Sequence, residues 1–322
     1  MAMPEEAAPI PDPNSDLGFG AVVARESRQR LLNRDGSFNV KREGLGPLHS
    51  LSLYHALLTM PWPRFLALVG LSYLALNASF ALAFLACGPD AIAGPSAAEM
   101  TGGSEFLRAF FFSVQTFATI GYGHLSPMGV PVNLLVTFES LFGLLGFALA
   151  TGLLFSRFAR PTARVLFSRW AIIAPYQGHT AFEFRIVNAR SSQLIEVQAT
   201  VMVSLFRDGD GKRRNFAPLK LERPRVVFFP LAWTIVHPID EQSPLHGLSR
   251  DELARSDAEF LVLLTGFDET FSQTVHTRSS YKMDEVVWGA RFTNLFNPPG
   301  EDGLLSIDIA RLDEIERTPL PV

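Results

Sequence analysis

The stretch Thr119-Ile120-Gly121-Tyr122-Gly123 decides the fold of this chain. Glycine adopts left-handed backbone conformations at little cost, so its two glycines predict a backbone that follows neither a helix nor a strand. Ile120 and Tyr122 are large enough to pack outward and hold such a loop in place. What the loop does depends on the segments that surround it.

Two long apolar segments lie on either side of this string. The segment 65–88 is free of charged residues apart from its flanks, and 132–157 is apolar up to Ser156 except for Glu139. About 20 helical residues at roughly 1.5 Å each cover the roughly 30 Å of hydrocarbon in a bilayer, so both segments predict transmembrane helices. The segment 105–118 is apolar but too short to cross, which predicts a re-entrant helix. Irregular backbone survives at membrane depth only inside protein or along a wet cavity, so the string is expected to face a pore.

Basic residues gather before the first span and directly after the second, whereas Arg108 stands alone among acidic residues between them. The two groups are Arg25, Arg28, Arg30, Arg34, Lys41, Arg42 and Arg64, and then Arg157, Arg160, Arg164 and Arg169. The positive-inside rule therefore predicts a multi-pass protein of the cell (inner) membrane with both termini in the cytoplasm.

The remaining composition narrows the functions. A net charge of -4 does not suggest a nucleic-acid surface, and a single cysteine excludes an intramolecular disulfide framework and a cysteine-cluster metal site. Residues 1–16 are rich in proline, alanine and acids and are expected to be disordered. The segment 47–60 has apolar residues at helical spacing and predicts a short helix along the membrane surface. A helix packed on the cytoplasmic part is the alternative.

Beyond Arg169 the pattern changes from helices to strands. Apolar and polar side chains alternate along 195–205, which is typical of a strand with one wet face. Further short apolar runs are separated by glycine, proline and aspartate. Roughly 150 residues of this kind predict an antiparallel sandwich.

The string between the spans has the chemistry of a potassium site. A potassium ion sheds its water inside a pore only where oxygens replace it, and a row of backbone carbonyls does so without burying a fixed charge. The carbonyls of Thr119, Ile120, Gly121 and Tyr122 are the expected ligands, and the string matches the known filter motif. One chain supplies one wall, so four-fold closure predicts a homotetramer. We expect passive potassium conduction, with potassium as permeant ligand, no cofactor and no enzymatic activity.

With these features in place, the chain from about Phe38 to about Arg311 resembles the inward-rectifier potassium channels, particularly the bacterial KirBac type. The strings that carry the resemblance are Leu57-Leu58-Thr59-Met60-Pro61-Trp62, Phe111-Phe112-Ser113-Val114, Ala159-Arg160-Pro161, Asn188-Ala189-Arg190 and His237-Pro238-Ile239-Asp240-Glu241-Gln242-Ser243-Pro244-Leu245. The resemblance implies that the surface helix is a slide helix and that the tail is an immunoglobulin-like sandwich extending the pore. We also group the chain with the voltage-gated channels.

These inferences divide the chain into four parts. They are a cytoplasmic arm (1–46), the slide helix (47–63), a pore domain (64–157) and a cytoplasmic β-sandwich domain with its C-terminal tail (158–322). The pore domain comprises an outer helix (65–88), a pore helix (105–118), the filter (119–123) and an inner helix (132–157).

The resemblance assigns further roles along the inner helix. Phe155 matches a hydrophobic gate and shares a helix face with Thr151 and Phe147, although it can alternatively face lipid or the first helix. Gly143 matches a proposed hinge, and close helix packing explains a glycine there equally well. Phe147 stands where strongly rectifying relatives carry an acidic or amide residue, which weakens the case for strong rectification.

Two acidic residues and two departures from the family pattern complete the candidate pore. Glu196 and Glu269 match acidic residues that line the family's cytoplasmic pore. They either form a vestibule that attracts cations or belong to ordinary solvated surface. Block by polyamine, Mg²⁺ or Ba²⁺ is a family expectation. Gln115 replaces a glutamate behind the filter. His124 replaces an aspartate at the outer mouth, so external acid is expected to reduce the current.

Five arginines at the inner ends of the two spans and just beyond them, called the basic collar below, have two possible roles. Arg64, Arg157, Arg160, Arg164 and Arg169 are candidate contacts for anionic membrane lipids, including phosphoinositides, or they only set the topology.

Two rival functions find no support in the sequence. A ligand-gated channel with a nucleotide-binding domain calls for Gly-x-Gly-x-x-Gly after the second span, and a catalytic tail calls for a motif such as Gly-x-Ser-x-Gly or His-Glu-x-x-His. Neither kind of motif is present. His237 of the tail is expected to be a turn or hydrogen-bonding residue.

Overall fold

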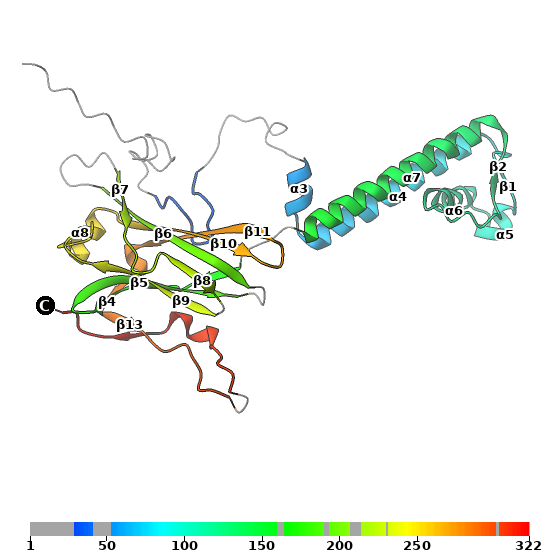
Figure 1. Cartoon of the computed structure of the whole chain (residues 1–322). Coiled ribbons are helices and arrows are strands. Elements are labelled where there is room, and N and C mark those ends of the chain that lie inside the picture. Colours follow the sequence, from blue (N-terminus) through cyan, green and yellow to red (C-terminus); the bar gives the residue numbers. More distant parts are fainter. Residues whose placement is uncertain are drawn as a thin grey trace, which may run out of the picture. The chain divides into compact units, whose positions relative to one another are not determined.

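The computed structural model describes residues 29–40, 53–159, 164–189, 193–206, 214–229, 231–300 and 303–321. The chain forms two compact units (Figure 1). One is Glu43–Arg160, and the other combines Met1–Arg42 with Pro161–Val322. The stretch expected to be disordered, 1–16, and the first residues of the expected slide helix lie outside the described residues.

The first unit is built on two long helices that lie side by side (Figure 1). They are α4 (Trp62–Ala86) and α7 (Gly129–Phe158), and both are long and apolar enough to cross a membrane. Each begins three residues before its expected start. The reason is local, because Pro63 and Pro131 lie in the first helical turns, where a missing N–H costs no hydrogen bond.

Short elements join the two long helices. They are α3 (Leu53–Thr59) before α4, and then β1 (Ile92–Ala93), α5 (Ala97–Thr101), α6 (Glu105–Phe117) and β2 (Ser126–Pro127). The hydroxyl of Ser104 caps α6, and the antiparallel pair β1–β2 closes the loop around it. Helix α6 packs against both α4 and α7, with Phe112 beside Phe84 in a buried cluster.

The second unit is a β-sandwich. Its strands are β3 (Val165–Phe167), β4 (Ala171–Tyr176), β5 (His179–Asn188), β6 (Leu194–Phe206), β7 (Arg214–Leu219), β8 (Arg225–Phe229), β9 (Ala232–Ile239), β10 (Glu259–Asp268), β11 (Gln273–Lys282), β12 (Val286–Trp288), β13 (Ala290–Phe292) and β14 (Ile315–Arg317). Helix α8 (Arg250–Arg255) and two 3₁₀ turns, η1 (Met283–Glu285) and η2 (Ile309–Asp313), complete it.

Two five-stranded sheets form this sandwich. One has the order β11-β10-β6-β7 with β8 also on β6, and the other has β12-β4-β5-β3 with β9 also on β5. One hydrophobic core draws on both sheets, and Phe182 of β5 stacks on Phe260 of β10 with 4.1 Å between ring centroids. All pairings within the two sheets are antiparallel except β12 with β4, among the described residues.

A bulge interrupts the expected alternation of β6. The register shifts so that Glu196 and Val197 together lie opposite Gly266 of β10, and Glu196 has a φ of 52°. The bulge places Leu194 in the core, while Ile195, expected on the apolar face, is only half-buried.

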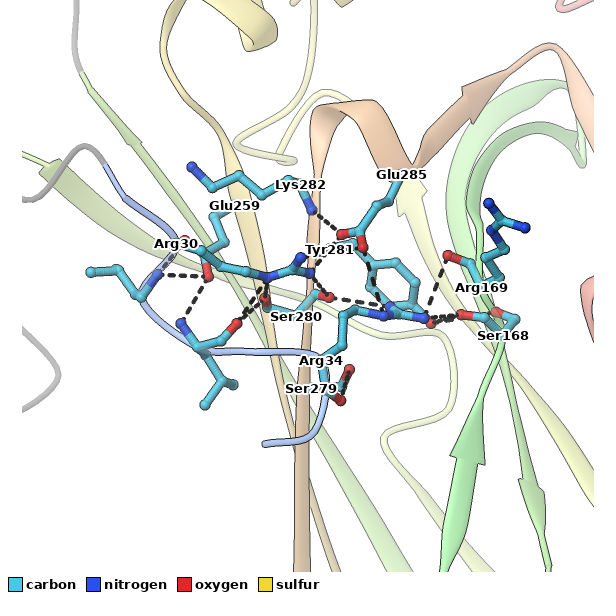
Figure 2. A network of polar contacts seen from close by, with 12 residues as sticks. Arg30, Arg34, Ser168, Arg169, Glu259, Ser279, Ser280, Tyr281, Lys282 and Glu285 are labelled. Carbon is cyan, nitrogen blue, oxygen red and sulfur yellow. Dashed lines mark hydrogen bonds and ion pairs between the residues drawn. The ribbon is translucent and has the colours of Figure 1, made fainter. Parts of the chain in front are cut away.

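The N-terminal segment 29–40 packs on the sandwich. The backbone N–H groups of Leu31 and Leu32 donate to the buried carboxyl of Glu259, and both leucines pack on Leu261. Figure 2 shows that Arg30 lies at the centre of the same contacts. This part of the expected N-terminal arm belongs to the sandwich unit.

Candidate pore and filter

The backbone angle φ changes sign from residue to residue along the filter string. Thr119, Gly121 and Gly123 have φ values of 57°, 55° and 80°, whereas Ile120 and Tyr122 are not among the residues with positive φ. A φ that changes sign from one residue to the next occurs in neither a regular helix nor a regular strand. This irregular backbone is compatible with the row of ion-coordinating carbonyls expected here.

The end of the pore helix α6 holds this loop from behind. The backbone carbonyl of Gln115 accepts hydrogen bonds from the N–H groups of Ile120 at 2.8 Å and Gly121 at 3.4 Å. These bonds use a carbonyl that the helix leaves free at its C-terminal end. The half-buried side chain of Gln115 makes no hydrogen bond within the described part of the chain. Support by its amide therefore stays a prediction, whereas support by its backbone is observed.

The outer edge of the filter rests on a glycine that lies far from it in the sequence. Gly94 has a φ of 128°, and a Cβ there would lie 2.1 Å from the carbonyl oxygen of His124. Any side chain at position 94 would displace this loop. The side chain of His124 is exposed. No sequence signal distinguishes Gly94 from other loop glycines, because the contact depends on the β1–β2 pairing.

The inner helix α7 presents three of the candidate pore residues on its surface. Phe147, Thr151 and Phe155 follow one another at intervals of four residues, and all three are exposed in the single chain. Gly143 precedes them in the same row and is buried. A Cβ at Gly143 would lie 2.4 Å from the carbonyl oxygen of Phe117 at the end of the pore helix. This contact gives a packing reason for the glycine, while its role as a hinge stays a prediction.

Arg157 has protein partners close at hand. Its guanidinium donates to the carbonyl of Leu57 and, at 2.7 Å, to the carbonyl of Met60, which lie at the C-terminal end of α3. It also lies over the rings of Trp62 and Phe65, with 4.6 and 4.5 Å to their centroids. The positive charge thus caps the negative end of α3, a role that the placement of charges along the sequence does not reveal.

The other members of the basic collar are placed differently. Arg64 is exposed near the start of α4. Arg164 and Arg169 are exposed in the sandwich unit, where Arg169 lies over the ring of Trp170. Arg160 lies outside the described residues. Contacts of this group with lipid remain predictions.

The two candidate acids of the cytoplasmic pore lie at one end of the β6–β10 pair. The exposed Glu196 forms an ion pair with Arg225 of β8 at 2.7 Å, and the exposed Glu269 donates its backbone N–H to Gln193 at 3.4 Å. The pairing with Arg225 reduces the field that Glu196 can offer to a passing cation.

The described residues contain no group of histidine, cysteine and acidic side chains that could hold a metal ion. The ring of His237 is buried, and its two nitrogens contact the carbonyl of Lys220 at 2.7 Å and the hydroxyl of Ser243 at 2.8 Å. Burial lowers the pKa of His237. The expectation of a hydrogen-bonding histidine is therefore confirmed.

Two apolar helices around a re-entrant helix and a filter loop, followed by a β-sandwich, define the subunit of a two-span ion channel. Residues 65–160 match the model of the ion channel family, and residues 165–322 match that of the inward rectifier potassium channel C-terminal domain. The chain belongs to the inward-rectifier potassium channel family.

Named relatives agree with this assignment. The inward rectifier potassium channel Kirbac3.1 of Paramagnetospirillum magnetotacticum is 44% identical over 301 residues, which cover 92% of this chain and 99% of the relative. The G protein-activated inward rectifier potassium channel 3 of Homo sapiens is 30% identical over 92% of this chain and 80% of its own length. The human ATP-sensitive inward rectifier potassium channel 11 is 28% identical over 93% and 81%.

These relatives confirm an inward-rectifier potassium channel subunit of a membrane, with a pore domain and a β-rich C-terminal domain. They correct the grouping with voltage-gated channels, because the matched family consists of inward rectifiers. The described structure agrees, since neither of its two candidate spans carries the series of arginines that senses voltage.

Proposed function

We propose that this subunit assembles into a homotetramer that conducts potassium selectively and passively through the filter 119–123. The observation that carries the proposal is the positive φ of every second residue, Thr119, Gly121 and Gly123, in a loop that follows and is held by the pore helix. In one chain all five filter residues are exposed, as expected for one wall of a site that several chains enclose. The positive-inside rule supports cytoplasmic termini.

Potassium and sodium flux through purified protein in liposomes tests the proposal. Gly123→Ala is the informative variant, because its φ of 80° disfavours any side chain by roughly 1–2 kcal/mol while no atom blocks the added methyl group. Gly178→Ala is the matched control, since Gly178 has a φ of 85° in the β4–β5 turn and equally open space. We expect wild type and Gly178→Ala to conduct potassium over sodium and Gly123→Ala to lose flux or selectivity. Equal sodium and potassium flux through wild type contradicts the proposal.

The inner end of α7 is proposed as the gate. Phe155 is 73% exposed in the single chain, and four such rings around an axis would exclude water from a narrow pore. Phe155→Ala is expected to raise resting flux. Leu149→Ala, on the same helix but outside the row of Phe147 and Phe155, is expected to leave resting flux near wild type. A Phe155→Ala channel that stays as closed as wild type argues for a ring that faces lipid.

Anionic lipid is proposed to modulate this gate through the exposed members of the collar. Arg64 is the described candidate in the membrane unit, and each exposed cation near the membrane surface gains about 1 kcal/mol from anionic lipid. Arg157 is proposed instead to join α3 to α7, two residues beyond Phe155. Flux with and without phosphoinositide in the vesicles separates the two roles. Arg64→Gln is expected to weaken the lipid response, and an unchanged response removes Arg64 from the proposal.

The outer and cytoplasmic mouths are proposed to affect conduction by charge. His124 stands where the family usually carries an aspartate, and external acid is expected to reduce the current. Comparison with His124→Asp across about pH 5 to 8 tests this, and identical titrations contradict it. At the cytoplasmic mouth, Glu196 and Glu269 are proposed to favour block by polyamine, Mg²⁺ or Ba²⁺. If block is unchanged in the variant that combines Glu196→Gln with Glu269→Gln, the two residues are solvated surface and have no part in block.

A further inference from the structure

A buried polar cluster joins the three helices α4, α6 and α7. Glu139 of α7, Ser113 of the pore helix α6 and Asn77 of α4 are each 0% exposed. The hydroxyl oxygen of Ser113 contacts both the Oε1 atom of Glu139 and, at 3.0 Å, the Oδ1 atom of Asn77. An ionisable side chain at membrane depth is costly, so its presence in an apolar helix calls for an explanation that helix packing does not supply.

Hydrogen-bond accounting limits the donor and acceptor roles of these three side chains. The Nδ2 group of Asn77 donates to the carbonyl of Tyr73 at 2.8 Å, which turns the Oδ1 acceptor towards Ser113. A serine hydroxyl has one proton and cannot donate to two acceptors at once. If Ser113 donates to Asn77, then its contact with Glu139 is a hydrogen bond only when Glu139 supplies the proton.

The surroundings of Glu139 favour the protonated form. Within the described part of the chain Glu139 forms no ion pair, and its Oε2 atom has no hydrogen-bond partner. The nearest cation of the pore helix, Arg108, is occupied by the carbonyls of Ile92 and Pro95 and by Glu105. A carboxylate without a counter-charge in an apolar site would be far more costly than a neutral acid.

The cluster acts on the helix that holds the filter. Ser113 lies two residues before Gln115, whose carbonyl accepts the N–H groups of Ile120 and Gly121. One turn further along α7 from Glu139, Gly143 meets the end of the same pore helix. We propose that Glu139 is a neutral, proton-donating carboxylic acid that positions the pore helix through Ser113 and thereby keeps the filter conducting. The effect on conduction rests on the proposed function of the filter, whereas the protonation does not.

Infrared spectroscopy and flux together test this proposal. The difference spectrum between wild type and Glu139→Gln is expected to show the C=O band of a protonated carboxyl group in wild type only, at neutral pH. Glu105→Gln is the control, because Glu105 is largely exposed on the same pore helix and is expected to remove a carboxylate band instead. A carboxylate band assigned to Glu139 overturns the proposal whatever the flux shows. If the channel proves not to select potassium, the band still reports whether Glu139 is protonated.

Rescue by a conservative variant separates positioning from simple packing. The amide of Glu139→Gln can still donate to Ser113, so this variant is expected to sustain potassium flux like wild type. Glu139→Ala and Ser113→Ala remove the bond and are expected to reduce sustained flux by on the order of tenfold. A Glu139→Gln channel as impaired as Glu139→Ala contradicts the proposal. Failure of Glu139→Gln to assemble also contradicts it, since the proposal requires that a neutral donor be tolerated.

Discussion

Replacing Arg30 by lysine is expected to loosen the N-terminal segment from the sandwich without unfolding the sandwich. The Arg30 guanidinium donates to the carbonyl of Leu32, to the hydroxyl and carbonyl of Ser280 and to both carboxyl oxygens of Glu285 (Figure 2). Lysine has the same charge but a single nitrogen, so it cannot reproduce this planar fork. The substitution therefore keeps the charge and removes the geometry.

The magnitude follows from these contacts. The two bonds from Arg30 to Glu285 measure 3.2 and 2.6 Å, and the two side chains are 22% and 19% exposed, so solvent screens them only in part. A hydrogen bond to a charged group contributes about 1.5–3 kcal/mol, and a lysine retains some of that. We expect a net loss of about 1–2 kcal/mol, which raises the open population of the segment roughly 5- to 30-fold.

Hydrogen exchange measures this opening directly. The amides of Leu31 and Leu32 donate to Glu259 and are expected to exchange when the segment leaves the sandwich. Arg291→Lys makes the same chemical change at an exposed ion pair, 3.0 Å from Glu316, and should leave the N-terminal amides unchanged. Unchanged protection in Arg30→Lys, or an equal loss in Arg291→Lys, refutes the reasoning.

Three further substitutions test other parts of the molecule. Gly143→Ala forces a methyl group to 2.4 Å from a pore-helix carbonyl and should lower stability by about 1–3 kcal/mol. In the control Gly146→Ala the nearest atom is 3.7 Å away, so stability should not fall, and equal melting temperatures of the two variants contradict this reasoning. Arg157→Lys should alter flux even in neutral-lipid vesicles, and an effect confined to anionic vesicles would favour a lipid contact. Burial raises the pKa of Glu183 to about 7, against the partly offsetting charge of Arg185, so the folded state binds a proton that the unfolded state releases. Stability is therefore expected to fall as the pH rises from about 4.5 to 7, by up to about 2–3 kcal/mol, and denaturation curves of Glu183→Gln should lack this slope; parallel wild-type and variant profiles would contradict it.

The filter could be predicted from the sequence only where glycine marks it. Gly121 and Gly123 signalled two of the three left-handed positions, but Thr119 did not, because a β-branched residue adopts a positive φ only when its surroundings impose it. The same limit applies to Gly94, whose requirement for glycine comes from a loop distant in sequence. Motifs therefore locate the filter, and tertiary contacts decide which neighbouring residues hold it.

Charge and periodicity predicted the spans and the sandwich but not their local partners. The basic collar gave an orientation, yet nothing in the sequence showed that Arg157 caps α3 rather than facing lipid. The alternation along β6 predicted a strand, while the bulge at Glu196 depends on the register with β10. The docking of Arg30 on Glu285 links residues far apart in the chain, and no local pattern reports such a contact.

One row of residues along α7 links the filter to the proposed gate. Glu139, Gly143, Phe147, Thr151 and Phe155 are each four residues apart, so they form a continuous ridge that turns by about 40° at each step. The first two are buried against the pore helix, and the last three are exposed. Because one stiff ridge serves both ends, a rotation of α7 that moves Phe155 is expected to strain the contacts of Gly143 and Glu139 as well. The filter, which is held from behind by the backbone carbonyl of Gln115, is then coupled to the helix whose inner end is the proposed gate.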